Sequence, residues 1–274
     1  MKRVLLFCAL AFLLCVLLAP EKKSVFSQEA ITCDLPFHPE WETKSAPSAE
    51  LESALAQTYR YLGSGGQCYC FVSADDKYVL KFFKQKAFSV PDWGFLKGKR
   101  IKKKESKRDR IYSAFRLAYD ELREETALLY VHLNPTQILQ KTIRVTDKEN
   151  AEHTIDLDKT PFALQRKAEL AFGYIDRQDT EGAKKAIDDL LNLHTRLYKR
   201  GYRNRDPNIR SNCGFLNGRP ILFDVGRIVQ DHKPLKIKTE LERITPRLYR
   251  YLAQKHPDLL PHLESTVNQI AAEK

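Results

Sequence analysis

The apolar residues of the chain fall partly into short runs that are typical of strands. Such runs are rich in Val, Phe, Tyr and Cys or are bounded by turn residues, and they predict three hairpins and one further strand. The hairpins are formed by 67–73 with 77–83, by 142–145 with 153–157, and by residues within 213–223, and the further strand is 162–164. The first two hairpins turn at the polar segments 74–76 and 147–150. The third turns around Asn217 and Gly218, and Asn-Gly is a strong signal for a tight hairpin turn.

Other apolar residues recur at helical spacing. Four stretches have this spacing or a helix-compatible composition, namely 48–62, 108–133, 180–199 and the chain from 240 onward. Leu51, Leu55 and Tyr59 recur every four residues in the first stretch. Pro135 is expected to close the second helix, and Gly201 is expected to stop the third.

The order of these elements predicts an α+β protein with two lobes. A mostly antiparallel, β-rich N-lobe at 48–169 is followed by a mostly helical C-lobe at 170–274. A cleft between two such lobes is the expected place for a ligand.

The N-terminus predicts membrane targeting. Lys2 and Arg3 precede an uninterrupted apolar run that extends to Ala19, which is typical of a secretory signal or a short signal-anchor. We assign 1–27 to this segment and 28–47 to a linker, and the sequence leaves both cleavage and retention open. The protein is therefore expected to be exported or membrane-associated, on a side that flanking charges do not decide.

The net charge of +11 is concentrated in one segment. Residues 84–110 contain eleven Lys or Arg and three Asp or Glu, which leaves a net charge of only +3 for the rest of the chain. We interpret this segment as a basic insertion that is solvated or that contacts an anionic membrane surface. Binding of nucleic acid is disfavoured because no aromatic ladder or zinc-ligand spacing accompanies it. Cys68 and Cys70 would share a strand face, which indicates packing rather than a disulfide.

Two motifs in the N-lobe suit the binding of phosphate. Glycine-rich residues precede the first hairpin, at Gly63, Ser64, Gly65 and Gly66. Glycines let backbone N–H groups approach phosphate without interference from a Cβ atom. Lys81 lies within the apolar strand that follows, where a lysine needs a partner. The next predicted helix offers Glu124 as this partner, with Glu125 as the alternative.

The C-lobe contributes a second pair of motifs. After the helix that ends near Gly201 come Arg205 and Asp206, with asparagines at 208 and 212, and a hairpin then leads to Asp224-Val225-Gly226. This succession resembles the catalytic loop and the Asp-Phe-Gly element of the protein-kinase-like superfamily, which includes aminoglycoside, sugar and lipopolysaccharide kinases.

The resemblance implies an ATP- and Mg²⁺-dependent phosphotransferase that acts on an unidentified hydroxyl of a sugar, lipid, small molecule or protein. By position, Asp206 would be the catalytic carboxylate, and Asn212 and Asp224 would bind the metal. Lys81 would bind the nucleotide phosphates, together with the glycine-rich residues and Glu124. The chain departs from the family pattern at four positions. Cys68 replaces the third glycine of the loop, Asn204 replaces the histidine of the catalytic loop, and Val225 replaces the phenylalanine of the Asp-Phe-Gly element. Asn212 lies one residue further from Asp206 than the family's asparagine does from its aspartate. Asn208 therefore remains an alternative metal ligand.

Two other functions fit the same residues. The altered glycine loop and the displaced asparagine suit a pseudokinase, as does export away from cytosolic ATP. An exported interaction protein could instead use the basic segment to bind an acidic partner.

Overall fold

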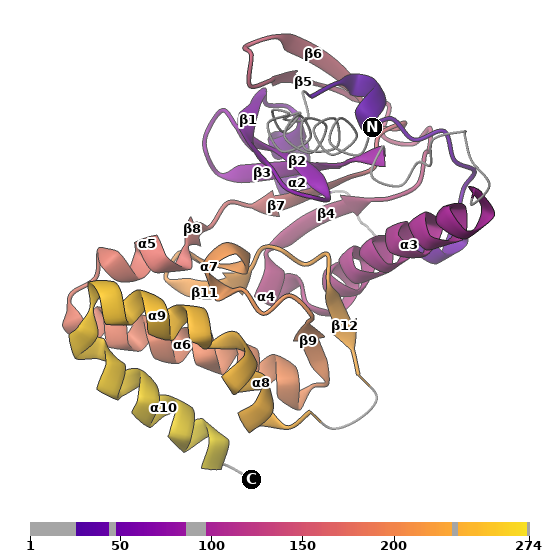
Figure 1. The fold of residues 1–274 in the computed structure, drawn as a ribbon. Helices are drawn as coiled ribbons and strands as arrows, with labels where there is room; N and C mark the ends of the chain where they lie inside the picture. Colours follow the sequence, from indigo (N-terminus) through magenta and orange to yellow (C-terminus); the bar gives the residue numbers. More distant parts are fainter. Residues whose placement is uncertain (1–25, 44–47, 86–96, 232–234, 273–274) are drawn as a thin grey trace, which may run out of the picture.

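The computed structural model describes residues 26–43, 48–85, 97–231 and 235–272, except for the side chains of 97–104 and 106. The predicted apolar targeting run and the centre of the basic segment lie outside these residues. Figure 1 shows a β-rich part and a helical part stacked on each other, with one long helix, α3, along the side of the β-rich part. None of the helices within the described ranges combines the length and the apolarity needed to cross a membrane.

The β-rich part is built on a seven-stranded sheet. Its strands, in order across the sheet, are β4 (Leu128–His132), β7 (Phe162–Arg166), β3 (Tyr78–Phe83), β2 (Cys68–Ser73), β1 (Tyr59–Ser64), β5 (Thr142–Thr146) and β6 (Glu152–Asp156). All neighbours are antiparallel except β1 and β5. The hairpins predicted at 67–83 and 142–157 are confirmed as β2–β3 and β5–β6.

Side chains alternate between the two faces of this sheet, as strand geometry requires. Phe71, Leu80 and Phe82 belong to a core on one face. Cys68 and Phe83 belong to the second core, which α3 and the helical part share. Since Lys81 lies two residues before Phe83, the same alternation turns it toward the helical part.

Two small sheets join the sheet to the helices. One contains β8 (Glu169–Leu170), β10 (Cys213–Leu216) and β11 (Arg219–Leu222), and the other contains β9 (Tyr202–Asn204) and β12 (Ile228–Gln230). The predicted hairpin at 213–223 is confirmed. Its turn residues Asn217 and Gly218 have φ angles of 50° and 77°, the left-handed values that an Asn-Gly hairpin turn requires.

The helical part is centred on α6 (Thr180–Lys199), whose bounds the sequence predicts correctly. The side chain of Asp179 caps its first turn by accepting a hydrogen bond from the Gly182 N–H at 2.7 Å. Gly201 follows its end with a φ of +80°, where a Cβ atom would lie only 2.9 Å from the Asp231 carbonyl oxygen. The remaining helices of this part are α5 (Ala171–Asp176), α7 (Ile209–Asn212), α8 (Ile237–Ile244), α9 (Pro246–Lys255), η4 (Pro257–Leu259) and α10 (Leu260–Ala272).

Two predicted helices need correction. The stretch 48–62 contains α2 (Ala49–Leu55), but Tyr59 already begins strand β1. The predicted helix 108–133 is displaced: α3 (Lys97–Glu121) begins within the basic segment, α4 (Arg123–Thr126) is a single turn, and β4 replaces the rest. Ala127 adopts left-handed geometry with a φ of 54°, which ends the helix and lets the apolar run after it pair with β7.

The described part of the predicted linker packs on the β-rich part. It contains two short turns, η1 (Gln28–Ala30) and η2 (Pro39–Trp41). Phe26, which precedes η1 and belongs to the predicted targeting segment 1–27, is buried with its ring edge-on to Tyr69 and Phe71, at centroid distances of 5.2 and 5.1 Å. Trp41 stacks on His38 at 3.9 Å and is also buried. This segment therefore contributes to the core.

Candidate functional site

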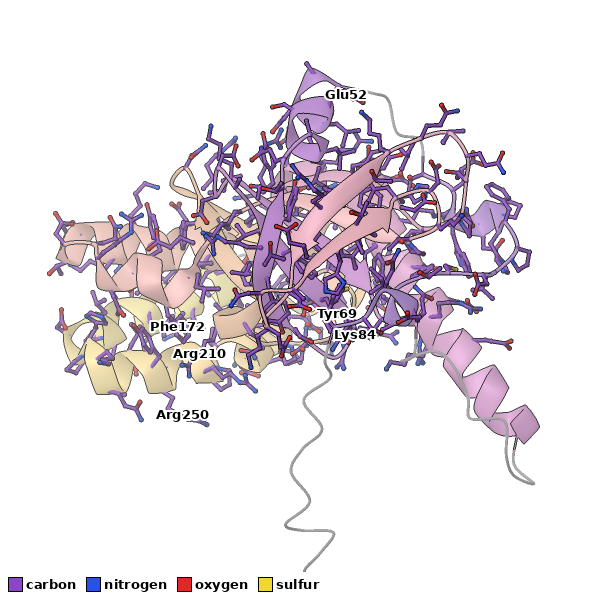
Figure 2. The ribbon with its side chains drawn as sticks, turned by 90° about the horizontal axis from the view of Figure 1, so that it is seen from above. Glu52, Tyr69, Lys84, Phe172, Arg210 and Arg250 are labelled. Carbon is purple, nitrogen blue, oxygen red and sulfur yellow. The ribbon has the colours of Figure 1, made fainter. Side chains whose placement is uncertain are left out.

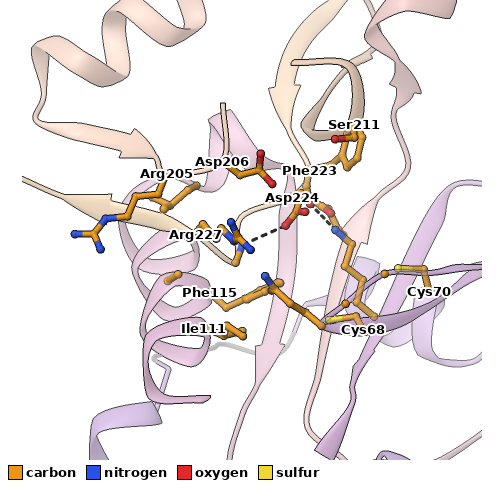
Figure 3. Close-up of a pocket in the computed structure, with 18 of the residues that line it drawn as sticks. Cys68, Cys70, Ile111, Phe115, Arg205, Asp206, Ser211, Phe223, Asp224 and Arg227 are labelled. Atoms are coloured by element: carbon orange, nitrogen blue, oxygen red, sulfur yellow. Dashed lines mark hydrogen bonds between the residues drawn. The ribbon is translucent and has the colours of Figure 1, made fainter. Parts of the chain in front are cut away.

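A cavity of about 1360 Å³ lies between the seven-stranded sheet and the helical part. Its walls come from β1, β2, β3, α3, the connection from β7 to β8, and the loops that follow β9 and β11. Figure 3 shows Cys68 and Cys70 on one side of it, Ile111 and Phe115 of α3 on another, and Asp206 and Asp224 above both. Segments that are far apart in the sequence thus border one space.

Lys81 enters this cavity from β3. It is paired in register with Cys70 of β2 and Ala163 of β7, and its side chain is only 8% exposed. Its Nζ atom donates a hydrogen bond to the carbonyl oxygen of Phe223 and lies 5.8 Å from the centre of that ring. Burial raises the pKa of the Cys70 thiol, which favours a neutral group beside the lysine.

The structure does not bring Glu124 to Lys81. Glu124 is exposed on α4 and does not line the cavity. The alternative, Glu125, forms an ion pair with Arg200 instead. The predicted contact of Glu124 with Lys81 assumed a helix that continues to 133. The helix instead ends before Ala127, and the chain continues as β4. Within the described ranges, no ion pair joins Lys81 to a carboxylate.

Asp206 and Asp224 both line the cavity, and Asn204 connects them. The Asn204 amide nitrogen donates to the Asp224 carbonyl oxygen at 2.8 Å, while its amide oxygen accepts from the Asp206 N–H at 3.0 Å. Arg243 holds Asn204 in turn, donating to its carbonyl oxygen at 2.8 Å. One buried amide therefore fixes the backbone of both aspartates.

Asn212 supports the same loop from the other side. Its amide nitrogen donates to the Asp206 carbonyl oxygen at 3.2 Å, and its amide oxygen accepts from the Ser211 hydroxyl at 2.9 Å. Asn212 is 3% exposed and does not line the cavity. Asn208 does not line it either, although its amide oxygen is buried without a hydrogen-bond partner among the described residues.

The donor atoms at the cavity suit a magnesium ion that is shared with a ligand. Mg²⁺ in such sites is usually held by one or two carboxylates together with substrate phosphates and water. The Asp224 carboxylate borders the cavity, and its closest recorded partner is the Gly226 N–H at 3.4 Å. No cluster of three or more His, Cys, Asp or Glu that could hold a metal without a ligand occurs in the described ranges.

The glycine-rich turn contributes only in part. Gly65 and Gly66 line the cavity, whereas Gly63 and Ser64 belong to β1 and do not. The Ser64 hydroxyl accepts a hydrogen bond from Lys84 Nζ at 2.5 Å, and that ammonium group also lies 4.4 Å from the centre of the Tyr69 ring. Figure 2 shows Tyr69 and Lys84 close together. Lys84 therefore connects the end of β3 to β1 and β2 beside the glycine-rich turn.

Gln67 connects the glycine-rich turn to the Asp-Val-Gly segment. Its side-chain amide lies so close to Gly226 that a Cβ atom at this glycine would overlap it. Both residues line the cavity. Nothing in the local sequence pattern around Gln67 indicates a contact across the cavity.

One rim of the cavity is apolar. Leu62 of β1 and Leu170 of β8 are 48% and 57% exposed, and both line the cavity together with Val79 of β3. Lys167 and Ala168, in the connection from β7 to β8, also border it. The exposed leucines and Val79 give this part of the lining an apolar character that suits a flat apolar group.

No protein-family model and no curated protein match the sequence. The structure is similar to that of the bifunctional kinase-methyltransferase WbdD, with a TM-score of 0.42, 14% identity, and coverage of 78% of this chain and 46% of that chain. It is also similar to the ROP18 kinase domain in complex with AMP-PNP and sucrose, with a TM-score of 0.45, 15% identity, and coverage of 72% of this chain and 63% of that chain. The chain thus spans less than two thirds of each of these structures.

Proposed function

We propose that the protein is a phosphotransferase that uses ATP and Mg²⁺ to phosphorylate a hydroxyl group. One observation carries this proposal: Lys81, Asp206 and Asp224 line a single cavity, although they come from a strand and two loops that are distant in the sequence. Phosphoryl transfer requires mainly positioning and electrostatic stabilisation, and these three side chains are of the types that supply both.

The nucleotide would lie between the apolar rim and Lys81. The base would contact the apolar lining at Leu62 and Leu170, and the phosphates extend toward the Lys81 ammonium group and the backbone of Gly65 and Gly66. Lys81 Nζ hydrogen-bonds to a neutral carbonyl rather than to a carboxylate, so its charge is available to a phosphate.

Asp224 would hold the magnesium ion against the phosphates. When bound, the ion neutralises charge on the phosphate oxygens. Since the Asn212 amide is engaged with Asp206 and Ser211, we assign Asn212 a supporting role in this conformation and keep Asn208 as the second candidate ligand. The Asp206 carboxylate would orient the acceptor hydroxyl and take its proton.

The first experiment measures nucleotide binding and turnover separately. A thermal-shift titration with Mg²⁺–ATP tests binding, and ADP release tests turnover. Asp206→Asn should retain binding and lose turnover, whereas Arg219→Gln, at an exposed position of β11 away from the cavity, should change neither. Full turnover by Asp206→Asn would refute the assignment of Asp206. Binding without turnover by the wild type would indicate a pseudokinase, and no binding at millimolar nucleotide would indicate an interaction protein.

We also propose that the N-terminal apolar run targets the protein for export or anchors it to a membrane. The basis is the charged start and the apolar composition of 1–19. The basic segment 84–110, except for Lys107 and Arg110, which line the cavity, would then lie against anionic headgroups. A protease-protection assay on intact cells would show on which side of the membrane residue 28 onward lies. Recovery of the chain in the soluble cytosolic fraction would refute the proposal.

A further inference from the structure

Basic side chains dominate the cavity. Seven of its lining residues are Lys or Arg and three are Asp. Two of the basic residues already have carboxylate partners, since Arg166 pairs with Glu50 and Lys167 with Asp76. Lys81 is assigned to the nucleotide. Four cations are left without an assigned role: Lys107, Arg110, Arg205 and Arg227.

These four side chains are exposed, and none forms an ion pair with an acid of the described residues. The carboxylate nearest to the first two in the chain, Asp109, also lines the cavity but faces Arg108 at 3.8 Å. A group of like charges without counter-charges is unfavourable for a folded protein by itself, and it raises the local concentration of anions. The arrangement therefore indicates a ligand rather than a structural role.

The four cations reach the cavity from two directions. Arg205 immediately precedes Asp206, and its N–H donates to the Arg227 carbonyl oxygen at 3.0 Å. Lys107 and Arg110 belong to α3, which packs beside β12, the strand that follows Arg227. Figure 3 shows Arg227 between Asp206 and Phe115 of α3, whereas the Arg205 side chain extends away from Asp206. This is the end of the cavity where the proposed acceptor hydroxyl would enter.

We propose that the acceptor itself carries an anionic group, a phosphate or a carboxylate, which Lys107, Arg110 and Arg227 bind while its hydroxyl faces Asp206. This inference rests on the proposed phosphotransferase function. In the reaction, the acceptor oxygen forms a bond to the γ-phosphorus of ATP as the bond between that phosphorus and the β–γ bridging oxygen breaks. ADP leaves with the electron pair, and the hydroxyl proton passes to the Asp206 carboxylate. Arginine suits this binding role because its guanidinium group can pair with phosphate or carboxylate through two parallel hydrogen bonds.

The test uses three small alcohols that differ in the anionic group: glycerol, glycerol 3-phosphate and glycerate. Binding to the full chain is measured by calorimetry, with and without Mg²⁺–AMP-PNP, and turnover with ATP follows. At least one of the two anionic alcohols should bind at least about tenfold more tightly than glycerol, and the preference should weaken as salt rises. Which of the two binds more tightly identifies the group as phosphate or carboxylate.

Arg110→Gln and Arg227→Gln locate the site. Each should reduce the preference for the anionic alcohol by about fivefold or more while the affinity for Mg²⁺–AMP-PNP and the unfolding temperature stay unchanged. Arg219→Gln is the matched control. Equal binding of the three alcohols would overturn the inference, as would an equal loss of nucleotide affinity in the two variants. If the anionic preference holds but Mg²⁺–AMP-PNP does not bind, the anion site stands and the phosphotransferase function fails.

Discussion

Lys81 of β3 donates a hydrogen bond to the carbonyl oxygen of Phe223, the residue that precedes Asp224. The lysine thus reaches across the cavity from the sheet to the Asp-Val-Gly segment. In this conformation its contact is with the loop that carries the proposed metal ligand and not with a carboxylate on a helix. The contact joins the two parts of the molecule at the proposed phosphate position.

Replacing Lys81 should therefore weaken nucleotide binding more than folding. Lys81→Met keeps the length of the side chain and its packing beside Cys70, but it removes the charge. We expect the dissociation constant of Mg²⁺–AMP-PNP to rise at least about tenfold, the loss expected for one charge-assisted contact. Calorimetry gives the affinity and thermal unfolding gives the stability. Lys77→Met, at an exposed position before β3, is the control, and an unchanged affinity in Lys81→Met would contradict the assignment.

Asn204 should be a positioning residue for both aspartates. Asn204→Leu has a similar volume but loses both hydrogen bonds, to the Asp224 carbonyl oxygen and from the Asp206 N–H. Since both partners lie in loops at the cavity, we expect turnover to fall by about tenfold or more and stability to fall by about 1–3 kcal/mol. Chemical denaturation and steady-state kinetics measure the two effects. Asn268→Leu, on the exposed side of α10, controls for the leucine itself. Wild-type kinetics in Asn204→Leu would show that these bonds are dispensable.

Substitution by alanine should destabilise the fold to different extents at Gly214 and at Gly226. A Cβ atom at Gly214 would overlap the Glu169 carbonyl oxygen, which is backbone and cannot move without breaking the pairing of β8 with β10. At Gly226 the obstacle is the end of the flexible Gln67 side chain. We therefore expect Gly214→Ala to destabilise the fold by about 2 kcal/mol or more, and Gly226→Ala by much less. Urea unfolding of the two variants checks this order, and the reverse order would contradict it.

The buried His194 should make stability depend on pH. Burial lowers its pKa to about 4, and within the described ranges its ring nitrogens contact the Tyr198 hydroxyl and the Cys213 thiol. The unfolded chain, with an ordinary histidine pKa near 6.5, binds the proton first as the pH falls. The stabilisation that depends on a neutral His194 is therefore complete above about pH 6.5. As the pH falls to about 4, the free energy of unfolding decreases by up to about 3 kcal/mol from this source.

His194→Gln removes this titration. Its free energy of unfolding should fall less steeply between about pH 6.5 and 4 than that of the wild type, because no proton is taken up at this position on unfolding. Urea denaturation at a series of pH values gives both slopes. His262→Gln is a control on the same part of the fold, since His262 is partly exposed and contacts Asp188. Identical slopes for His194→Gln and the wild type would exclude His194 as the source.

The sequence predicts strands best where turn residues mark their ends. It predicts α6 well because this helix has a strong apolar face and clear capping residues. It misplaces α3 because the first half of this helix is a run of Lys and Arg with little apolar periodicity. It also takes Leu128 to Leu133 for helix, since a continuous apolar run fits a buried strand equally well. Lys81, Asp206 and Asp224 are found together because their motifs occur in a recognisable order. Gln67 and Arg227 acquire their contacts only when distant segments pack, so no local pattern reveals them. The bond from Asn204 to the Asp224 carbonyl oxygen likewise depends on packing.

The central claim is that Lys81, Asp206 and Asp224 form one site for a metal-bound nucleotide. Calorimetric titration of AMP-PNP into the wild type and into Asp224→Asn, each with and without Mg²⁺, tests it most directly. Mg²⁺ should increase the affinity of the wild type for AMP-PNP by at least about tenfold, and this increase should disappear in Asp224→Asn. An absence of binding by the wild type, or an equal effect of Mg²⁺ on both proteins, would contradict the central claim.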